Sequence, residues 1–429
     1  MNNFLGRTSW CLLCLLGLTF RSQAQSTAVP MGNQPMEPTS WSFECAIGPT
    51  CAGYDSWIST TSKPGTVRLW NAGTEWDLVE TSAGVYDWTY FDIWLDQIAA
   101  HQPLAVLYTF GHVPCWISTN SCTGSGWAHW SPSPPSDLTT SGSPAFKAFV
   151  TAVVKHCSPA GNCVKDYIKY WEMWNEANSP VSWTGTVTQV YDMFKPVIPI
   201  IRNNVPNAIV STPPVDGDIP WVNSWMALEN TKGRLSDYFG LHLYLMNLTP
   251  EERIANIEQM VSTKNKNGWT NTPWMNTETN FGNDTSQYTC SSQYSAEDCR
   301  TQLVRWHILQ YAYQGGAGGA FMVGWYHWES ISNGGDDTFY YTMMKWLEGA
   351  TFTSSCANDG NVWTCPLTEG SGAKALIVWN AAGDSNYAPA TNYIDYRKFN
   401  GTYGGATENI TAGQTTTIGL SPIMFETAK

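Results

Sequence analysis

Short apolar segments alternate with segments of helical periodicity along most of this chain, and that alternation limits the possible folds more than any other feature. Strands are expected at 41–47, 66–70, 104–110, 167–174, 208–211, 238–244, 273–278 and 319–325. The clearest intervening helix is expected at 144–157, where Ser143 is a natural N-cap and Pro144 takes the first helical position. Eight strands that alternate with helices over roughly 300 residues predict an α/β fold of the (β/α)8 TIM-barrel class. The alternative is an open doubly wound sheet, but no glycine-rich phosphate loop follows the first strand.

The beginning of the chain differs from this pattern. Residues 1–24 combine Arg7, the apolar stretch Cys11–Phe20 and small residues up to Ala24, which is typical of a signal peptide cleaved after that alanine. The apolar stretch is too short to span a bilayer, although a retained membrane anchor is the alternative. Residues 25–40 are punctuated by proline and glycine and are expected to form a linker. We therefore expect a secreted chain whose fold begins after this linker.

The pattern changes again near residue 350. The barrel is expected to occupy residues 41–350. Beyond it, residues 351–429 contain strand-like segments at 374–379, 390–396 and 415–420, with turn residues between them. These segments predict a small all-β, sandwich-like domain packed on the barrel.

The charge balance is acidic, with 22 basic and 35 acidic residues and a net charge of −13. Removal of the predicted signal peptide takes away Arg7 and Arg21 and no acidic residue, so the mature chain is more acidic still. A negative surface argues against nucleic acid and anionic membranes as partners. It is compatible with a neutral ligand in an extracellular medium.

The cysteine pattern agrees with export from the cell. Two of the 12 cysteines lie in the predicted signal peptide, and the others fall in close pairs along the sequence. The simplest connectivity is a set of local disulfides, Cys45–Cys51, Cys115–Cys122, Cys157–Cys163, Cys290–Cys299 and Cys356–Cys365. The mature chain has no C-x-x-C pair and no clustered Cys/His spacing, so a metal site is not expected. We expect an extracellular protein, or a periplasmic one if the source is Gram-negative.

Aromatic residues are abundant, with 23 Trp, 20 Tyr and 15 Phe. Aromatic ring faces stack on the C–H faces of sugars while polar groups bind the hydroxyls, so rings at strand ends favour a carbohydrate ligand. The alternative is a tryptophan-rich core, which we expect to account for some of these residues.

Two of the expected strands end in a glutamate beside polar residues. The fourth strand runs into Asn175-Glu176 and the seventh into Thr277-Glu278. The two glutamates are about three βα units apart, which places them face to face across the mouth of a barrel. Paired carboxylates across a pocket suit glycoside hydrolysis, in which one group donates a proton and the other attacks the anomeric carbon. The alternative is that either glutamate is a salt-bridged barrel residue.

Between residues 68 and 328 the chain resembles the clan A glycoside hydrolases. Asn175-Glu176 is similar to the strand-four signature of that clan, and Glu278 to its strand-seven nucleophile. The segment 171–178 (WEMWNEAN), followed by Trp-Thr-Gly at 183–185, most resembles glycoside hydrolase family 39 and its relatives. The resemblance implies a secreted retaining enzyme that cleaves O-glycosidic bonds by double displacement, similar to β-xylosidases or β-glycosidases, without a metal or cofactor.

The resemblance also implies a role for each matching residue. Glu176 is expected to be the general acid/base, Glu278 the nucleophile, and Asn175 the group that binds the 2-hydroxyl of the sugar. Arg68 corresponds to the arginine that keeps the nucleophile ionised, with an ordinary barrel ion pair as the alternative. Ala177 stands where many clan members have proline, which weakens the assignment to a subfamily.

Further residues are expected around the same pocket. By the resemblance, His242 and Tyr244 lie near the nucleophile, and Trp328 forms the platform for the sugar. His112 follows the third strand and is expected either to line the pocket or to pack within its own loop. Glu172 lies four residues before Glu176 and is expected to point into the barrel interior.

Two other functions are alternatives. One is an endo-acting polysaccharidase of the same clan, and the other is a barrel that binds carbohydrate without turning it over. An oligosaccharide or polysaccharide is the expected partner in each case.

Overall fold

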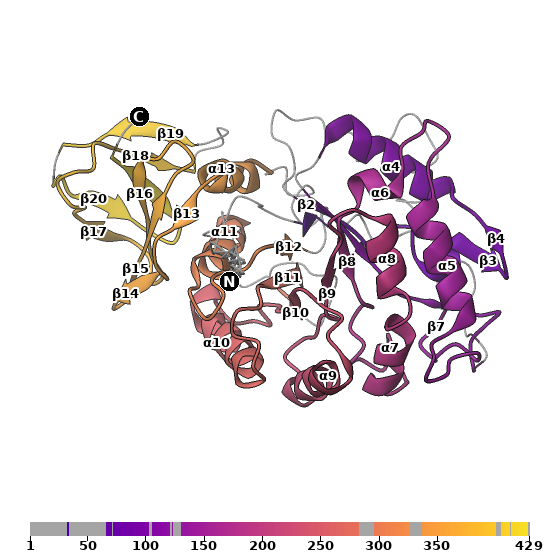
Figure 1. Ribbon diagram of the computed structural model, residues 1–429. Helices are drawn as coiled ribbons and strands as arrows, with labels where there is room; N and C mark the ends of the chain where they lie inside the picture. Colours follow the sequence, from indigo (N-terminus) through magenta and orange to yellow (C-terminus); the bar gives the residue numbers. More distant parts are fainter. Residues whose placement is uncertain are drawn as a thin grey trace, which may run out of the picture.

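The computed structural model describes residues 32–33, 66–70, 72–102, 105–120, 122, 130–282, 296–325, 337–399, 405–411 and 413–427. Two large sheets dominate this part of the chain, one parallel and one antiparallel (Figure 1). Across these residues no helix has the length and apolar character needed to cross a membrane. The predicted signal peptide lies outside the described residues.

The larger sheet has eight strands, and all of its neighbouring strands are parallel. Its order is β10-β11-β12-β1-β2-β5-β8-β9. In chain order the strands are β1 (Gly32–Asn33), β2 (Thr66–Leu69), β5 (Ala105–Thr109), β8 (Tyr170–Glu172), β9 (Ile209–Ser211), β10 (Phe239–His242), β11 (Trp274–Thr279) and β12 (Val323–Trp325). Strands β9 and β10, at the two ends of this order, are joined by single parallel bridges from Ser211 to Tyr238 and from Val215 to Leu241. The α/β fold predicted from the sequence is confirmed.

The strand between β12 and β2 was not predicted. It is β1, whose two residues, Gly32 and Asn33, belong to the segment interpreted as a linker. The expected strand 41–47 lies outside the described residues. Neither Gly32 nor Asn33 has an apolar side chain, so no pattern in the sequence marks them as a strand.

Helices α4 to α11 lie around the outside of the parallel strands (Figure 1). The helices are α3 (Trp76–Val79), α4 (Thr89–His101), α5 (Pro144–Lys155), α6 (Val164–Tyr167), α7 (Val187–Phe194), α8 (Ile198–Asn204), α9 (Ile219–Lys232), α10 (Pro250–Lys266), α11 (Ala296–Ala312) and α13 (Asp337–Leu347). Helix α5 begins as predicted, because the Ser143 hydroxyl accepts a hydrogen bond from the backbone N–H of Phe146.

Two helices illustrate how local chemistry sets the boundaries. A single helix containing a break was predicted from about residue 187 to 204, and the chain forms α7 and α8 there, with Pro196 between them, because proline has no N–H to donate. Helix α9 was not predicted. Its buried face includes Glu229, which accepts a hydrogen bond from the Trp225 indole, and this acid interrupts the apolar stripe by which a helix is recognised.

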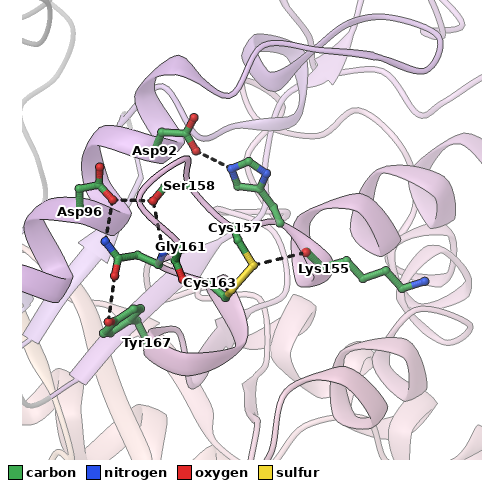
Figure 2. Close-up of a disulfide and its surroundings, with 10 residues drawn as sticks. Asp92, Asp96, Lys155, Cys157, Ser158, Gly161, Cys163 and Tyr167 are labelled. Carbon is green, nitrogen blue, oxygen red and sulfur yellow. Dashed lines mark hydrogen bonds and ion pairs between the residues drawn. A yellow bond between two sulfur atoms is a disulfide. The ribbon is translucent and has the colours of Figure 1, made fainter.

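The loop between α5 and α6 is fastened to itself and to α4, as Figure 2 shows. The Cys157–Cys163 disulfide closes the loop. Asp96 of α4 accepts hydrogen bonds from Ser158 and Asn162 at the base of the loop. These contacts fasten the loop between α5 and α6 to helix α4, which precedes β5 in the chain.

Three of the predicted disulfides are confirmed: Cys115–Cys122, Cys157–Cys163 and Cys356–Cys365. Cys299 is also disulfide-bonded, and its predicted partner Cys290 lies outside the described residues. The predicted pair Cys45–Cys51 lies outside them as well.

The antiparallel sheet begins after α13 and gathers at one side of the molecule (Figure 1). Its order is β13-β15-β16-β21-β18-β19, with β14 paired to β15, and β17 and β20 form a separate two-stranded sheet. The strands are β13 (Thr351–Phe352), β14 (Ala357–Asp359), β15 (Val362–Thr368), β16 (Lys374–Asn380), β17 (Ser385–Tyr387), β18 (Asp395–Lys398), β19 (Ala406–Asn409), β20 (Thr416–Ile418) and β21 (Ile423–Glu426). The strand expected at 390–396 is displaced, since β18 begins only at Asp395.

The two sheets share a core. One cluster of buried apolar side chains includes Val67 and Trp171 of the parallel sheet and also Phe352, Leu367 and Trp379 of the antiparallel sheet. The boundary predicted at residue 350 therefore falls inside a continuous region of packing, and the division into separate domains stays a prediction.

Candidate active site

Polar and charged side chains from three strands of the parallel sheet, and from the loop that follows a fourth strand, converge where these strands end. Arg68 comes from β2, and Asn175 and Glu176 come from the loop that follows β8. His242 is the last residue of β10, and Glu278 lies near the end of β11. The carboxyl ends of parallel strands meet at one edge of the sheet, which is where this fold class builds its sites.

Arg68 is the centre of the cluster and is fully buried. Its Nη1 donates to Glu278 Oε2 at 2.7 Å, and its Nη2 donates to Asn175 Oδ1 at 2.8 Å and to Glu172 Oε1 at 3.0 Å. Its Nε donates to Thr109 Oγ1 at 3.0 Å. Burial alone lowers the pKa of Arg68, but the negative charges of Glu172 and Glu278 raise it above its ordinary value. The guanidinium is therefore permanently charged and held in one orientation.

Glu278 receives a hydrogen bond on each carboxylate oxygen. Oε2 accepts from Arg68, and Oε1 accepts a short hydrogen bond from the Tyr244 hydroxyl. His242 Nδ1 lies 3.8 Å from Oε2. The side chain keeps 9% of its surface exposed, so the carboxylate is fixed by its neighbours yet open to a ligand on one side.

Glu176 is more accessible, with 27% of its side chain exposed. One oxygen, Oε1, lies 2.7 Å from His242 Nδ1. The backbone of Glu176 and of Trp174 is left-handed, with φ values of 43° and 64°, which non-glycine residues rarely adopt. The Trp174 indole donates to Ser182 O and packs edge-on against Trp183, and these contacts hold the strained loop in place.

The two catalytic candidates are close together. An oxygen of Glu176, an oxygen of Glu278 and a ring nitrogen of His242 all lie within 4.8 Å of one another. Two carboxylates about 5–5.5 Å apart suit direct attack on a sugar, because no room is left for a water between them. The same three side chains are of types that bind metals, but both oxygens of Glu278 already accept hydrogen bonds and the Arg68 cation lies beside them. The donor set therefore fits a substrate better than a second cation.

His242 connects the two glutamates. Burial of the ring alone lowers the pKa of His242, but the negative charges of Glu278 and Glu176 outweigh it and raise the pKa above its ordinary value. On the other side of the ring, Nε2 lies 3.4 Å from Arg68 Nη2. The ring can therefore hold a proton beside Glu176 at a pH where an exposed histidine would lose it.

His112 lies in a neighbouring aromatic group. Its ring stacks on Trp130 with a centroid distance of 4.2 Å and meets Trp70 edge-on at 5.0 Å, and its Nδ1 lies 3.3 Å from Asp77 Oδ1. Trp70 in turn lies beside the Arg68 guanidinium, 5.8 Å from ring centroid to cation. Trp70 therefore lies between His112 and Arg68. That His112 lines a substrate pocket stays a prediction.

Most of the residues predicted for the site lie together in the structure. Arg68, Asn175, Glu176, His242, Tyr244 and Glu278 are brought together as described. Trp328 lies outside the described residues. Glu172 is fully buried and contacts Arg68, in agreement with the prediction that it points into the interior.

Asp216 and Arg253 are charged residues of the site that the sequence analysis missed. Asp216 directly follows Val215, whose carbonyl accepts a hydrogen bond from the backbone N–H of His242. Burial raises the pKa of Asp216, and the negative charge of Glu176 raises it further. The Arg253 cation, 3.6 Å away, acts in the opposite direction and lowers this pKa. An acid in an Asp-Gly turn just after the fifth predicted strand was the available signal, since the loops after the strands carry the site in this fold class.

Sequence comparison assigns no relatives, since no family model and no curated protein matches the chain. Solved structures do resemble it. A glucosidase from Croceicoccus marinus matches with a TM-score of 0.63 at 12% identity, over 92% of this chain and 94% of that one. A GH39 β-xylosidase from Caulobacter crescentus matches with a TM-score of 0.59 at 13% identity, over 94% and 96% of the two chains.

A glycoside hydrolase family 30 subfamily 8 xylanase from Clostridium acetobutylicum also matches, with a TM-score of 0.58 at 14% identity over 92% of this chain and 95% of that one. At such low identities these likenesses establish a common fold. The α/β fold is shared with these glycosidases, in agreement with the resemblance that the sequence motifs suggested.

Proposed function

We propose that this chain is a retaining glycoside hydrolase that acts with Glu176 as general acid/base and Glu278 as nucleophile. The observation that carries the proposal is the approach of these two carboxylates, with oxygens within 4.8 Å of each other at the end of the parallel sheet. The fold shared with several glycosidases supports it.

In the first step Glu278 attacks the anomeric carbon of the bound sugar. The bond from that carbon to the leaving oxygen breaks, a bond to a Glu278 oxygen forms, and Glu176 transfers its proton to the leaving oxygen. Glu176 is suited to this role because it is the more exposed of the two carboxyls and can reach the group that departs.

In the second step water replaces the leaving group. Glu176, now ionised, takes a proton from the water as its oxygen attacks the anomeric carbon, and the bond to Glu278 breaks. The sugar leaves with the configuration it had at the start, and both carboxyls return to their original protonation states.

The neighbouring residues support these steps. Arg68 stabilises the ionised form of Glu278 through the 2.7 Å hydrogen bond to Oε2, and Tyr244 orients the other oxygen. Asn175 is fixed by Arg68 beside the acid, at the position from which an amide can bind the 2-hydroxyl. His242, with Nδ1 2.7 Å from Glu176 Oε1, stabilises that carboxyl while it is ionised between the two steps.

We further propose that the eight parallel strands form a closed (β/α)8 barrel and that the enzyme is secreted. The bridges between β9 and β10 support closure of the sheet. The three disulfides support an oxidising compartment. The substrate is an oligosaccharide or polysaccharide, with a β-xyloside or β-glucoside as the first choice because structurally similar proteins include a β-xylosidase and a glucosidase.

The test is hydrolysis of a panel of aryl glycosides and plant and microbial polysaccharides by the wild type and by Glu278→Ala. We expect the variant to lose activity by about 10⁴-fold or more, because the covalent step requires the carboxylate. Azide should restore part of the turnover by taking the place left open by the missing side chain. Glu348→Ala, which removes an exposed carboxyl far along the chain, is the matched control and should keep wild-type activity.

The same panel separates the alternatives. Activity on polymers with little on aryl monosaccharides would favour an endo-acting polysaccharidase. Binding to a polysaccharide without hydrolysis by the wild type would contradict the proposed function and favour a carbohydrate-binding protein. Wild-type activity in Glu278→Ala would contradict the assignment of the nucleophile.

A further inference from the structure

Glu172 is a third glutamate beside the two catalytic candidates. It is the last residue of β8 and is fully buried. Its Oε1 accepts hydrogen bonds from Arg68 Nη2 at 3.0 Å and from the Thr277 hydroxyl at 3.1 Å. Its Oε2 is buried and has no hydrogen-bond partner within the described ranges. A buried carboxylate with one bare oxygen is unfavourable for folding, so stability alone does not explain this arrangement.

The guanidinium of Arg68 is rigid and planar, so whatever holds one of its nitrogens also directs the others. Nη2 is held by Glu172 and Asn175, and only Nη1 reaches Glu278. An arginine free of other partners binds a carboxylate with two parallel hydrogen bonds. Such a pairing would engage both oxygens of Glu278 and compensate its charge fully.

We propose that Glu172 is a positioning residue, which holds Nη2 of Arg68 and thereby limits Arg68 to a single hydrogen bond with the nucleophile Glu278. This inference rests on the proposed function. By sharing the positive charge of Arg68, Glu172 leaves Glu278 only partly neutralised and therefore more reactive toward the anomeric carbon. The same contact fixes Arg68 where it orients Asn175, so one buried acid sets the geometry of both groups.

The charged groups around Glu172 and Arg68 come from several strands of the parallel sheet. Arg68 approaches from β2, Glu278 and Thr277 belong to β11, and His242 of β10 lies 3.4 Å from the same Arg68 nitrogen. The permanently charged Arg68 is thus shared by two carboxylates, Glu172 and Glu278. If Glu172 loses its charge, the positive charge of Arg68 acts more fully on Glu278. The ionised form of Glu278 is then favoured, and Glu278 becomes a weaker nucleophile.

The first test is Glu172→Gln, which keeps the shape and the hydrogen-bond acceptor but removes the charge. We expect kcat on an aryl glycoside to fall about 10- to 100-fold, with a smaller change in KM, because ground-state binding is untouched. The acidic limb of the pH profile of kcat/KM should move to lower pH. Glu172→Asp restores the charge, and it should return the acidic limb toward its wild-type position. Unchanged kcat and an unchanged pH profile in Glu172→Gln, with only a lower melting temperature, would overturn the proposal.

The second test does not require activity. In Glu172→Leu the acceptor for Nη2 is removed and replaced by an apolar group of similar size. A crystal structure of this variant should have both terminal nitrogens of Arg68 on Glu278, and retention of the single Nη1 contact would overturn the proposal. If the wild type hydrolyses nothing, the proposed function fails, and this structural result still decides whether Glu172 controls Arg68.

Discussion

Two arginine–glutamate pairs with nearly the same nitrogen–oxygen distance lie in the two sheets. Arg68 and Glu278 are 2.7 Å apart in the parallel sheet, and Arg397 and Glu426 are 2.6 Å apart in the antiparallel one. Arg68 is fully buried and serves four acceptors, whereas Arg397 keeps about a third of its side chain exposed. The distance within an ion pair therefore does not indicate what the pair does in the protein. The number of groups that share the arginine, and their exclusion from water, distinguish the two.

The comparison has a physical basis. A charge in the interior interacts more strongly with its neighbours than one near water, so a shared buried cation can set the orientation and charge of several groups at once. Water screens the charge of a partly exposed arginine such as Arg397, which mainly compensates the charge of its partner Glu426. The comparison predicts that matched substitutions in the two sheets have different consequences.

The largest difference is expected between Arg68→Met and Arg397→Met. Arg68→Met should lower kcat/KM at least about a thousandfold, because Glu278 and Asn175 both lose their fixed partner. It should also lower the free energy of unfolding by about 3–5 kcal/mol, since it leaves buried carboxylates uncompensated. Arg397→Met should keep activity and lose about 1–3 kcal/mol, because Glu426 is left buried without its partner. Steady-state kinetics measures kcat/KM, and urea unfolding measures the free energy of unfolding. Equal losses of activity in the two variants would contradict the expected difference between the two sheets.

A smaller difference is expected between two tyrosines that donate to glutamates. Tyr244→Phe removes the hydroxyl that orients Glu278 and should lower kcat roughly 10- to 100-fold. Tyr396→Phe removes the corresponding hydrogen bond to Glu408 in the antiparallel sheet and should leave kcat unchanged. Activity that survives intact in Tyr244→Phe would mean that Glu278 does not depend on that donor.

The smallest effect concerns pH, and it compares His242 with His307, a buried histidine of α11. The pKa of His242 is raised, so its contribution to stability is complete below about pH 6.5 and is lost as pH rises through its folded value. Burial lowers the pKa of His307 to about 4, so the folded state loses stability as pH falls from about 6.5 toward that value.

Melting temperatures of His242→Gln and His307→Gln, measured against the wild type across this range, test both signs. The deficit of His242→Gln should be largest at acidic pH and shrink above neutrality. His307→Gln should instead lose less stability than the wild type on acidification. The same pH dependence in both variants would refute the opposite assignments.

Much of the fold follows from patterns in the sequence. The runs that became β2, β5, β9, β10 and β11 are apolar and rich in β-formers, and capping residues marked the starts of α5 and α10. What escaped prediction lacked such signals. Strand β1 consists of Gly32 and Asn33, which owe their place to pairing with strands far along the chain. Helix α9 has a buried acid in its apolar face, which local periodicity cannot anticipate.

The candidate site was predictable in its residue types but not in its connections. Glutamates at two strand ends pointed to Glu176 and Glu278, and a family resemblance added Arg68, His242 and Tyr244. The left-handed backbone at Trp174 and Glu176 could not be predicted, because neither residue is a glycine. The sharing of Arg68 by Glu172, and the position of Asp216 next to His242, depend on register between strands, which a single sequence does not reveal.

The link between the sheets has a consequence for how the protein melts. Glu251 of α10 accepts hydrogen bonds from Arg305 of α11 and from the Trp379 indole of β16, and Trp379 belongs to the same apolar cluster as Ile257 of α10 and Ile308 of α11. Elements that share a core lose it together, so we expect a single cooperative calorimetric transition for the whole described chain. A chain cut after residue 350 would keep every proposed catalytic residue and still be a poor enzyme, because its helices α10 and α11 would have lost the surface against which they fold.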